Sequence, residues 1–323
     1  MLLLALSNLI WGSLSIPATD VLRILLGGEA EGHPQWSFII RESRFPQMLT
    51  ALLSGMSLSV CGLMLQTFFR NPLAGPSILG IDAGANLGVA LVMLLLGGTV
   101  TLGSLSVGGY LLVIVAAMAG ALCIMLLLLA LSSLLRSQVM LLITGVIISY
   151  VTGSVISLLN YSATEEGVHN FIIWGMGNFS GVSLDRLPLF CTLASTGLLG
   201  AALLAKSLDA ILLGERYATN LGTDVQATRH RILFCTGLLT ATTTAFCGPI
   251  SFLGLAVPHI ARLTLRTSLH RVMLPGTMLM GGCLTLLCNL LCTVPRSGSI
   301  IPVNVLTPLI GAPVILYVIL KKH

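Results

Sequence analysis

Long apolar stretches, interrupted by very few charged residues, limit how this chain can fold more than any other feature of its sequence. Of its 323 residues, 55% are hydrophobic and 8% carry a charge, whereas about 25% are charged in ordinary soluble domains. A membrane-spanning helix needs about 20 consecutive apolar residues. The sequence therefore predicts an all-α, polytopic membrane protein that forms a single transmembrane domain over residues 1–323.

Ten apolar stretches are interpreted as spans, although the first is short. They are Leu2–Ile16, Pro46–Thr67, Ile81–Gly97, Tyr110–Leu131, Val139–Leu159, Leu187–Ala205, Arg229–Cys247, Ile250–Leu265, Val272–Thr293 and Asn304–Leu320. The first stretch has no basic region before it and no small-residue cleavage site after it, which favours a span over a cleavable signal. Alternatively, the true start lies upstream and residue 1 is already inside the first helix.

The basic residues orient these spans. Ten spans place both termini on the same side of the membrane. With the termini inside, eleven of the sixteen Lys and Arg residues fall on the cytoplasmic side, in agreement with the positive-inside rule. We therefore expect both termini, and the segment Leu208–Gly222, in the cytoplasm.

Arg70–Gly88 interrupts the apolar pattern. It contains two prolines and four glycines, so it is not expected to form one regular helix. Irregular backbone persists in a membrane only where protein or a water-filled cavity covers it. The segment is therefore either the lining of such a cavity or a simple loop between helices.

Isolated polar residues near the spans have structural explanations. Asp82, at the start of a span, is expected to cap the helix N-terminus rather than to act as a functional acid. Glu165 and Glu166 lie in a predicted interfacial helix and favour a solvated face. His259 follows Pro258 and favours a donor to the carbonyl that the proline frees.

Leu208–Gly222 is an amphipathic, charge-bearing segment between two apolar stretches. Its first half has apolar residues at helical spacing. Gly214 permits a sharp turn, and a second short helix begins at Glu215 and ends before Gly222. This pattern fits either two short helices that dock onto a partner or an ordinary cytoplasmic loop with some helix.

The sequence lacks the patterns of catalytic or energy-converting sites. It has no phosphate-binding G-x-x-x-x-G-K-[ST] loop, no H-E-x-x-H, no nucleophile elbow and no Cys/His metal set. The eight cysteines are expected to pack in apolar stretches, and the net charge of +5 is too small and scattered to indicate nucleic-acid binding. No run of intramembrane acids indicates a proton relay. We expect no metal or cofactor on this chain, and a transporter of this kind must take its energy from a partner.

Arg41 and Arg44 precede the second predicted span on its outer side. Because they are three residues apart, a helical turn places both guanidinium groups on one side. Guanidinium groups suit bidentate capture of a carboxylate on a partner protein. The alternatives are that both anchor the helix end at lipid head groups or that Arg41 pairs with Glu42.

Five stretches together resemble the permease subunits of the type II ABC importers for iron chelates (siderophores or haem) and vitamin B12. They are RFPQMLTALLSGMSLSVCGLMLQTFFRNPLAGPSILGIDAGANLG (Arg44–Gly88), IIWGMGNFSG (Ile172–Gly181), LLGERYATNLG (Leu212–Gly222), GPISFLGLAVPHIARL (Gly248–Leu263) and LTPLIGAPV (Leu306–Val314). They follow the family's order and spacing along essentially the whole chain. The resemblance implies a ten-helix subunit that forms a homodimer in the bacterial inner membrane. Two cytoplasmic ABC ATPase subunits, which bind ATP and Mg²⁺, and a soluble or lipid-anchored substrate-binding protein complete the implied importer.

The resemblance also implies roles for particular residues. The coupling segment at 208–222 would contact the ATPase through Leu208, Ile211, Leu212, Leu213, Gly214, Glu215, Arg216, Ala218, Leu221 and Gly222. An inner gate would include Asn71, Leu73, Gln138 and Val139. The last two match by position only, because Ser137-Gln138-Val139 replaces the small hydroxyl residues of the vitamin B12 permease. Docking of the binding protein would use Arg41, Arg44 and Arg296.

Three classes of function compete at this point. The first is the permease of an ABC importer for a large metal chelate, an iron-siderophore or haem, with cobalamin as the alternative cargo. The second is an ion-coupled secondary carrier, and the third is an intramembrane enzyme. The coupling segment and the missing proton relay favour the first, and the missing catalytic residues disfavour the third.

Overall fold

The computed structural model describes residues 1–12, 14, 16–28, 30, 33–95, 99–102, 105–135, 137–293 and 301–321. These residues form a helical protein with one short antiparallel hairpin, β1 (Thr99–Leu102) and β2 (Leu105–Gly108). The helices are α1 (Leu2–Ile10), α2 (Ala18–Leu25), α3 (Pro34–Phe38), α4 (Phe45–Phe68), α5 (Ile81–Ala90), α6 (Tyr110–Leu134), α7 (Gln138–Ser162), α8 (Glu165–Gly175), α9 (Leu187–Leu203), α10 (Ala205–Leu213), α11 (Glu215–Asn220), α12 (Val225–Cys247), α13 (Leu253–Leu265), α14 (His270–Cys292) and α15 (Val303–Lys321). Short π-helical turns, η1 (Ile39–Arg44) and η3 (Leu91–Leu95), and a 3₁₀ turn, η2 (Pro76–Leu79), complete the described elements.

Each of the ten predicted spans overlaps one of the helices from α1 to α15 over most of its length. Four helical stretches in the described chain are long and apolar enough to cross a membrane on their own: Pro34–Phe68, Tyr110–Leu134, Gln138–Ser162 and His270–Cys292. The pair α9–α10, bent by 48°, adds a fifth. The remaining predicted spans are shorter apolar helices or, like α12, carry basic residues at one end. The all-helical, membrane-spanning class predicted from the sequence is confirmed.

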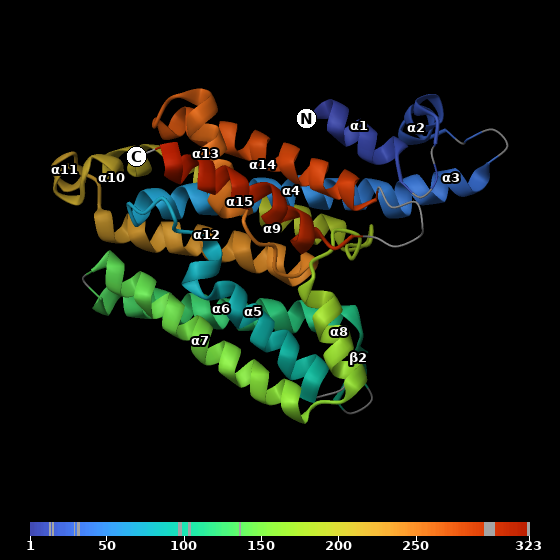
Figure 1. Ribbon diagram of the computed structural model, residues 1–323, viewed down its shortest axis with the longest axis horizontal. Coiled ribbons are helices and arrows are strands. Elements are labelled where there is room, and N and C mark those ends of the chain that lie inside the picture. The colour runs from blue at the N-terminus through green and yellow to red at the C-terminus, as the bar shows by residue number, and fades with distance from the viewer. Residues whose placement is uncertain are drawn as a thin grey trace.

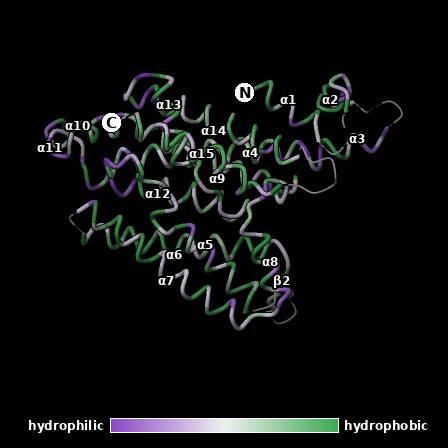
Figure 2. Tube along the Cα trace, viewed as in Figure 1, coloured by the Kyte–Doolittle hydropathy of each residue, from purple (hydrophilic) through white to green (hydrophobic). Residues whose placement is uncertain are grey.

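The helices are arranged along one long axis (Figure 1). α4, α12, α14 and α15 run lengthwise, and α5, α6 and α7 form a layer beside them. α10 and α11 lie at one end of this axis, and α2 and α3 lie at the opposite end. Figure 2 shows hydrophilic stretches at both of these ends. The polar ends and the apolar middle match a protein whose long axis crosses the bilayer.

α4 is the central helix of the fold. It forms the C-terminal part of the helical stretch Pro34–Phe68, whose most apolar 18-residue segment is 78% buried. It packs against α9, α12, α13 and α14. Its glycines allow other backbones to approach closely: a Cβ on Gly62 would lie 1.7 Å from the carbonyl oxygen of Gly254, and one on Gly55 would lie 2.4 Å from that of Gly281. Close contact through small residues stabilises helix pairs in membranes.

Two predicted boundaries differ from the structure. The helix expected to begin at Pro46 begins instead at Pro34, because the π-helical turn η1 joins α3 to α4 without a break. The irregular segment ends at Gly80, and the later glycines belong to the regular helix α5. Gly84 is helical because it packs against α6: a Cβ there would lie 2.5 Å from the carbonyl oxygen of Gly120.

Polar side chains satisfy the freed backbone of α13. Pro258 has no N–H, so it leaves the carbonyl of Gly254 without its helical partner. Gln66 Nε2 donates to that carbonyl at 3.3 Å. His259, which the sequence suggested for this task, instead has its Nε2 2.9 Å from the carbonyl oxygen of Pro72, because it points toward the loop after α4 and away from its own preceding turn.

Asp82 lies in the first turn of α5 but makes no capping hydrogen bond to the helix. The residue is 8% exposed, and its carboxylate accepts a hydrogen bond from Thr244 Oγ1 at 2.7 Å. The carboxylate is therefore held by a contact between α5 and α12, near the positive end of the α5 dipole. This differs from the cap expected from the sequence, because Thr244 provides the hydrogen bond that the α5 backbone does not.

Candidate coupling surface

α10 and α11 form a short angular unit at one end of the molecule (Figure 1). α10 leaves α9 at a bend of 48°. Gly214 joins α10 to α11 with φ 126° and ψ 148°, a conformation that side-chain-bearing L residues rarely adopt. The amide of Ala218 donates to the Gly214 carbonyl at 2.8 Å and starts the second helix. The two helices predicted from the sequence, and the turn between them, are therefore present.

The apolar residues of this unit face two ways. Three are fully buried against the rest of the chain: Leu208, Ile211 and Ala218. Four are exposed by 42–67%: Leu212, Leu213, Tyr217 and Leu221. Arg216 is also exposed, and Gly222 ends α11 with a positive φ of 81°. The expectation that the whole stripe contacts a partner is therefore corrected, because its buried members attach the unit to its own bundle and only the outer residues remain available.

A buried hydrogen-bonded chain joins α10 to two spans. Asp209 Oδ1 accepts from the backbone amide of His270 at 2.8 Å and lies 2.7 Å from His270 Nδ1. On the other side of the ring, His270 Nε2 lies 2.8 Å from Thr67 Oγ1. The imidazole is 2% exposed. α10 is thereby fixed to the start of α14 and the end of α4.

A second polar link joins α11 to α7 and α12. Gln138 Nε2 donates to Glu215 Oε1 at 2.7 Å, and Arg229 Nη2 lies 3.8 Å from the same oxygen. Arg229 Nη1 also donates to the carbonyls of Ser132 and Leu135 at 3.1 Å, where the end of α6 leaves carbonyls without helical partners. Its guanidinium carbon lies 5.7 Å from the centre of the Phe68 ring, at the end of α4.

The predicted gate residues lie around this unit. Gln138 contacts it directly, and Arg70, just before the other predicted gate stretch, donates to the carbonyl of Ile211 at 3.1 Å. Asn71 Oδ1 accepts from the amide of Leu73 at 2.9 Å and so closes its own turn. Leu73 is 47% exposed, and Val139 is 64% exposed. Both stretches therefore adjoin the unit formed by α10 and α11.

The hydrogen bond between Gln138 and Glu215 leads to a double-mutant prediction. In the importer that the resemblance implies, Gln138→Ala and Glu215→Ala are each expected to lower ATP-driven uptake, and the double variant is expected to lose little more than either single one. The coupling free energy should be about 1 kcal/mol, the usual net value of such a bond. The control cycle pairs Gln138→Ala with Arg216→Ala, whose effects should add. Additive effects in the Gln138–Glu215 cycle would show that this contact transmits nothing.

At the opposite end, Arg44 differs from its predicted docking role. It is 7% exposed, and its Nη1 donates to the carbonyls of Leu9 at 2.7 Å and Ile10 at 2.9 Å. Its Nη2 donates to the carbonyl of Leu14. The prediction is wrong for this residue because the carbonyls at the end of α1 have no partner within the helix, and the guanidinium group is buried where it donates to them.

Arg41 is the exposed member of the predicted docking pair. Its Nη2 lies 3.1 Å from the carbonyl oxygen of Ile24 and 3.2 Å from that of Gly28. These two bonds use one terminal nitrogen, and the other N–H donors of the guanidinium group have no hydrogen-bond partner among the described residues. Arg296, the third predicted docking residue, lies outside the described residues.

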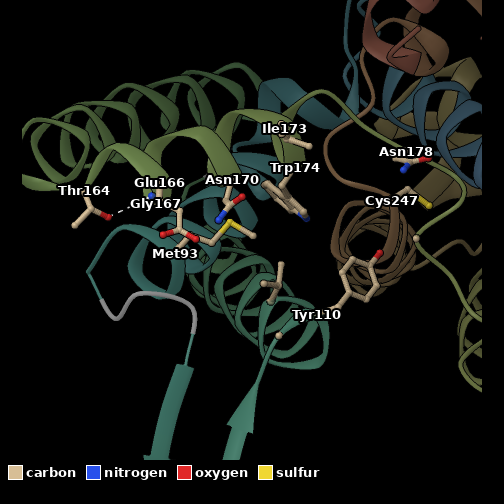
Figure 3. Close-up of a pocket in the computed structure, with 13 residues that line it drawn as sticks. Met93, Tyr110, Thr164, Glu166, Gly167, Asn170, Ile173, Trp174, Asn178 and Cys247 are labelled. Atoms are coloured by element: carbon tan, nitrogen blue, oxygen red, sulfur yellow. Dashed lines mark hydrogen bonds between the residues drawn. The ribbon is translucent and has the colours of Figure 1, made fainter. Parts of the chain in front are cut away.

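A cavity of about 450 Å³ lies between α6, α8 and the end of α12 (Figure 3). Tyr110, Trp174 and Glu166 line it. Trp174 Nε1 is buried and has no hydrogen-bond partner among the described residues, while the Tyr110 hydroxyl donates to the carbonyl of Phe246. Glu166 was expected on a solvated face and is exposed, at the edge of this cavity. The volume is in the range of small-ligand pockets.

The residues that connect the α10–α11 unit to the bundle were not predicted from the sequence. Asp209 and His270 are 61 residues apart, and Thr67 is 203 residues from His270. No short motif joins such positions. Arg229 is the local exception. It lies in the second turn of α12, and a charged residue so close to a span indicates by itself that partners are needed.

Comparison with known proteins agrees with this architecture. A model of the FecCD transport family matches residues 1–321. An ABC transporter permease protein of Methanocaldococcus jannaschii is 31% identical to the chain, covering 95% of it and 89% of the relative. The vitamin B12 import system permease protein BtuC of Photorhabdus laumondii is 33% identical over 86% of the chain and 80% of the relative. BtuC of an Escherichia coli strain is 32% identical over 90% of the chain and 86% of the relative.

A solved structure shows the same fold. It is an inward-facing conformation of a transporter assigned to the metal-chelate type of ABC transporters. The match has a TM-score of 0.85 and 28% sequence identity, and it covers 100% of this chain and 96% of the other. The similarity therefore extends over the whole helical architecture, including the end that carries α10 and α11.

Proposed function

The chain belongs to the FecCD transport family, and on that premise we propose that it is the membrane-spanning permease of an ABC importer for a large metal chelate. It would lie in the cytoplasmic membrane of a bacterial cell and move its cargo inward. The single observation that supports this best is the unit α10–α11. Its exposed apolar residues form a docking surface, and its buried ones join it to the ends of several spans.

ATP hydrolysis is assigned to separate partner subunits. We propose that two cytoplasmic ABC ATPases bind ATP and Mg²⁺ and dock against Leu212, Leu213 and Leu221. An amphipathic helical unit with an exposed apolar face is a recurring docking element, and the exposed Glu215 and Arg216 would provide polar contacts at its rim. This chain would contribute no catalytic residue, and it would convert motion of the docked ATPase into movement of its spans.

We further propose a homodimer, with the cargo passing between two copies. α7 supports this arrangement because it is the least buried of the four long helical stretches. Only 17% of its most apolar 18-residue segment is buried, against 78% for Pro34–Phe68. Val139, near the cytoplasmic end of α7, is 64% exposed and would lie near the inner gate. A chain that is fully active as a monomer in a nanodisc would contradict this proposal.

The cargo is proposed as an iron-siderophore or haem, with cobalamin as the alternative. Two relatives named above are vitamin B12 permeases, and the similar solved structure is assigned to the metal-chelate type. Both classes are large metal-containing ligands. Growth of a deletion strain on single iron or corrinoid sources would distinguish them.

A substrate-binding protein is proposed to dock at the outer end through Arg41. Charges at the rim of an interface change the association rate and its salt dependence more than they change the final affinity. Arg41→Glu is therefore expected to slow association about tenfold at low ionic strength and much less at high ionic strength. Stopped-flow association with the purified binding protein measures this. Equal rates for the parent and the variant across a salt series would remove Arg41 from the interface.

The test of the proposed function is uptake into sealed vesicles with and without a co-expressed ATPase. The proposal predicts uptake that requires both the ATPase and ATP. Uptake that persists without any ATPase, and that collapses with the proton gradient, would instead support the ion-coupled carrier.

A further inference from the structure

A groove of about 570 Å³ lies between the α9–α10 bend and the start of α14. Leu203, Leu274 and Met278 provide its apolar wall, and Lys206 and Arg271 provide its basic residues. The described lining residues include no Asp or Glu. The groove is therefore apolar along the helices and positively charged at one end.

The two basic side chains are available for a ligand. Lys206 and Arg271 are both exposed, and neither has an ion pair or hydrogen bond within the described part of the chain. Asp209 is the nearby carboxylate on α10, but its Oδ1 is already bonded to the backbone amide and the ring of His270. An anionic ligand in the groove would therefore meet two unpaired cations.

The position of the groove relates it to the membrane surface. Lys206 follows the last turn of α9, and Arg271 is the second residue of α14. Leu203, on the wall, is 85% exposed, as expected for a side chain that faces lipid. The basic end therefore lies at the height of the head groups, and the apolar wall extends toward the hydrocarbon. The positive end of the α14 dipole also favours an anion there.

We propose that this groove binds an anionic phospholipid of the cytoplasmic leaflet. Its phosphate would interact with Lys206 and Arg271, and an acyl chain would lie along Leu203, Leu274 and Met278. Basic pockets between spans on the cytoplasmic side bind anionic head groups in this way. The lipid would bridge α9–α10 and α14 beside the Asp209–His270 link, and so would hold the coupling unit against the bundle. This inference relies on the proposed function only to decide which end of the molecule faces the cytoplasm.

The test measures lipid binding to the purified full chain without any ATPase. Native mass spectrometry follows titration with phosphatidylglycerol or with phosphatidylcholine. We expect the parent chain to prefer phosphatidylglycerol. The double variant Lys206→Gln/Arg271→Gln should bind it about 25-fold more weakly, which corresponds to about fivefold for each cation. Arg231→Gln is the matched control, because Arg231 is an exposed cation that lines a different groove, beside Phe234.

A photoreactive benzoyl-phenylalanine replacing Met278 identifies what occupies the groove. In vesicles that contain phosphatidylglycerol, it is expected to capture that lipid, and added inorganic phosphate should not prevent the capture. Capture of a second copy of the chain would overturn the proposal, since a protein would then fill the groove. Displacement by inorganic phosphate, or equal affinities for phosphatidylglycerol in the double variant and the parent, would overturn it as well. None of these results depends on ATP-driven uptake, so failure here is distinct from failure of the proposed function.

Discussion

The substitution Leu213→Glu is expected to lower ATP-driven uptake at least about 30-fold, the effect of losing one strong interface contact of about 2 kcal/mol. Leu213 is 65% exposed, so the new carboxylate stays in water in the isolated chain and folding is unaffected. At a docked ATPase the same carboxylate would be buried against apolar surface without a partner, which is strongly unfavourable. Uptake and permease-dependent ATPase activity in vesicles measure the effect.

Leu26→Glu is the matched control for this substitution. Leu26 is 88% exposed and follows α2 at the opposite end of the molecule. The variant therefore introduces the same charge at a still more exposed site, at the end of the molecule away from the proposed ATPase surface. We expect normal stimulation of the ATPase in this variant. If Leu213→Glu also gave normal uptake and stimulation, the exposed face of α10 would have no part in docking.

The second large effect is expected from Gly62→Ala, which should prevent stable folding. A Cβ at this position would lie 1.7 Å from the carbonyl oxygen of Gly254 and 2.4 Å from its carbonyl carbon. Both are backbone atoms of α13, so relief requires the two helices to separate. Gln66, one turn along α4, would then lose its hydrogen bond to the same carbonyl. Overpacking typically costs about 1–3 kcal/mol, and the cost is expected at or above the upper end here because backbone atoms have to separate.

The measurement is the yield and melting temperature of the purified chain, compared with Gly153→Ala. Gly153 lies in the middle of α7, and a Cβ there would meet nothing within 4 Å. That control should fold normally or gain slightly in stability, since alanine is the better helix former. Equal melting temperatures for the two variants would mean that α4 and α13 do not cross as closely as described.

The spans could be predicted from the sequence because their cause is local. The length of an apolar stretch and the prolines and glycines around it decide where a span lies, and each predicted span overlaps a helix. The turn at Gly214 between two short helices is predictable for the same local reason. The role of Gly84 is not, because its small size permits contact with α6 inside a regular helix, and that contact involves residues remote in the sequence.

Polar residues were harder to predict because their partners are distant. Arg44 looked like a docking residue until the folded chain placed the carbonyls of Leu9 and Ile10 against it. Gln138 and Glu215 were predicted separately, as gate and coupling residues, but they are 77 residues apart and no pattern indicated that they bond to each other. The hydrogen bond between Gln138 and Glu215 in the folded chain joins the proposed gate to the proposed coupling segment.

The most direct test of the central proposal, that α10 and α11 receive the ATPase, is photochemical cross-linking from α11. Tyr217, in α11, is 67% exposed. Tyr161 is 90% exposed and lies at the C-terminal end of α7, opposite the end that carries Gln138. A benzoyl-phenylalanine replacing each tyrosine in turn keeps an aromatic ring at both sites. Illumination of membranes that contain the assembled importer should join the ATPase subunit to position 217 and not to position 161. An ATPase adduct at position 161, or none at position 217 in an importer that is active in uptake, would contradict the account.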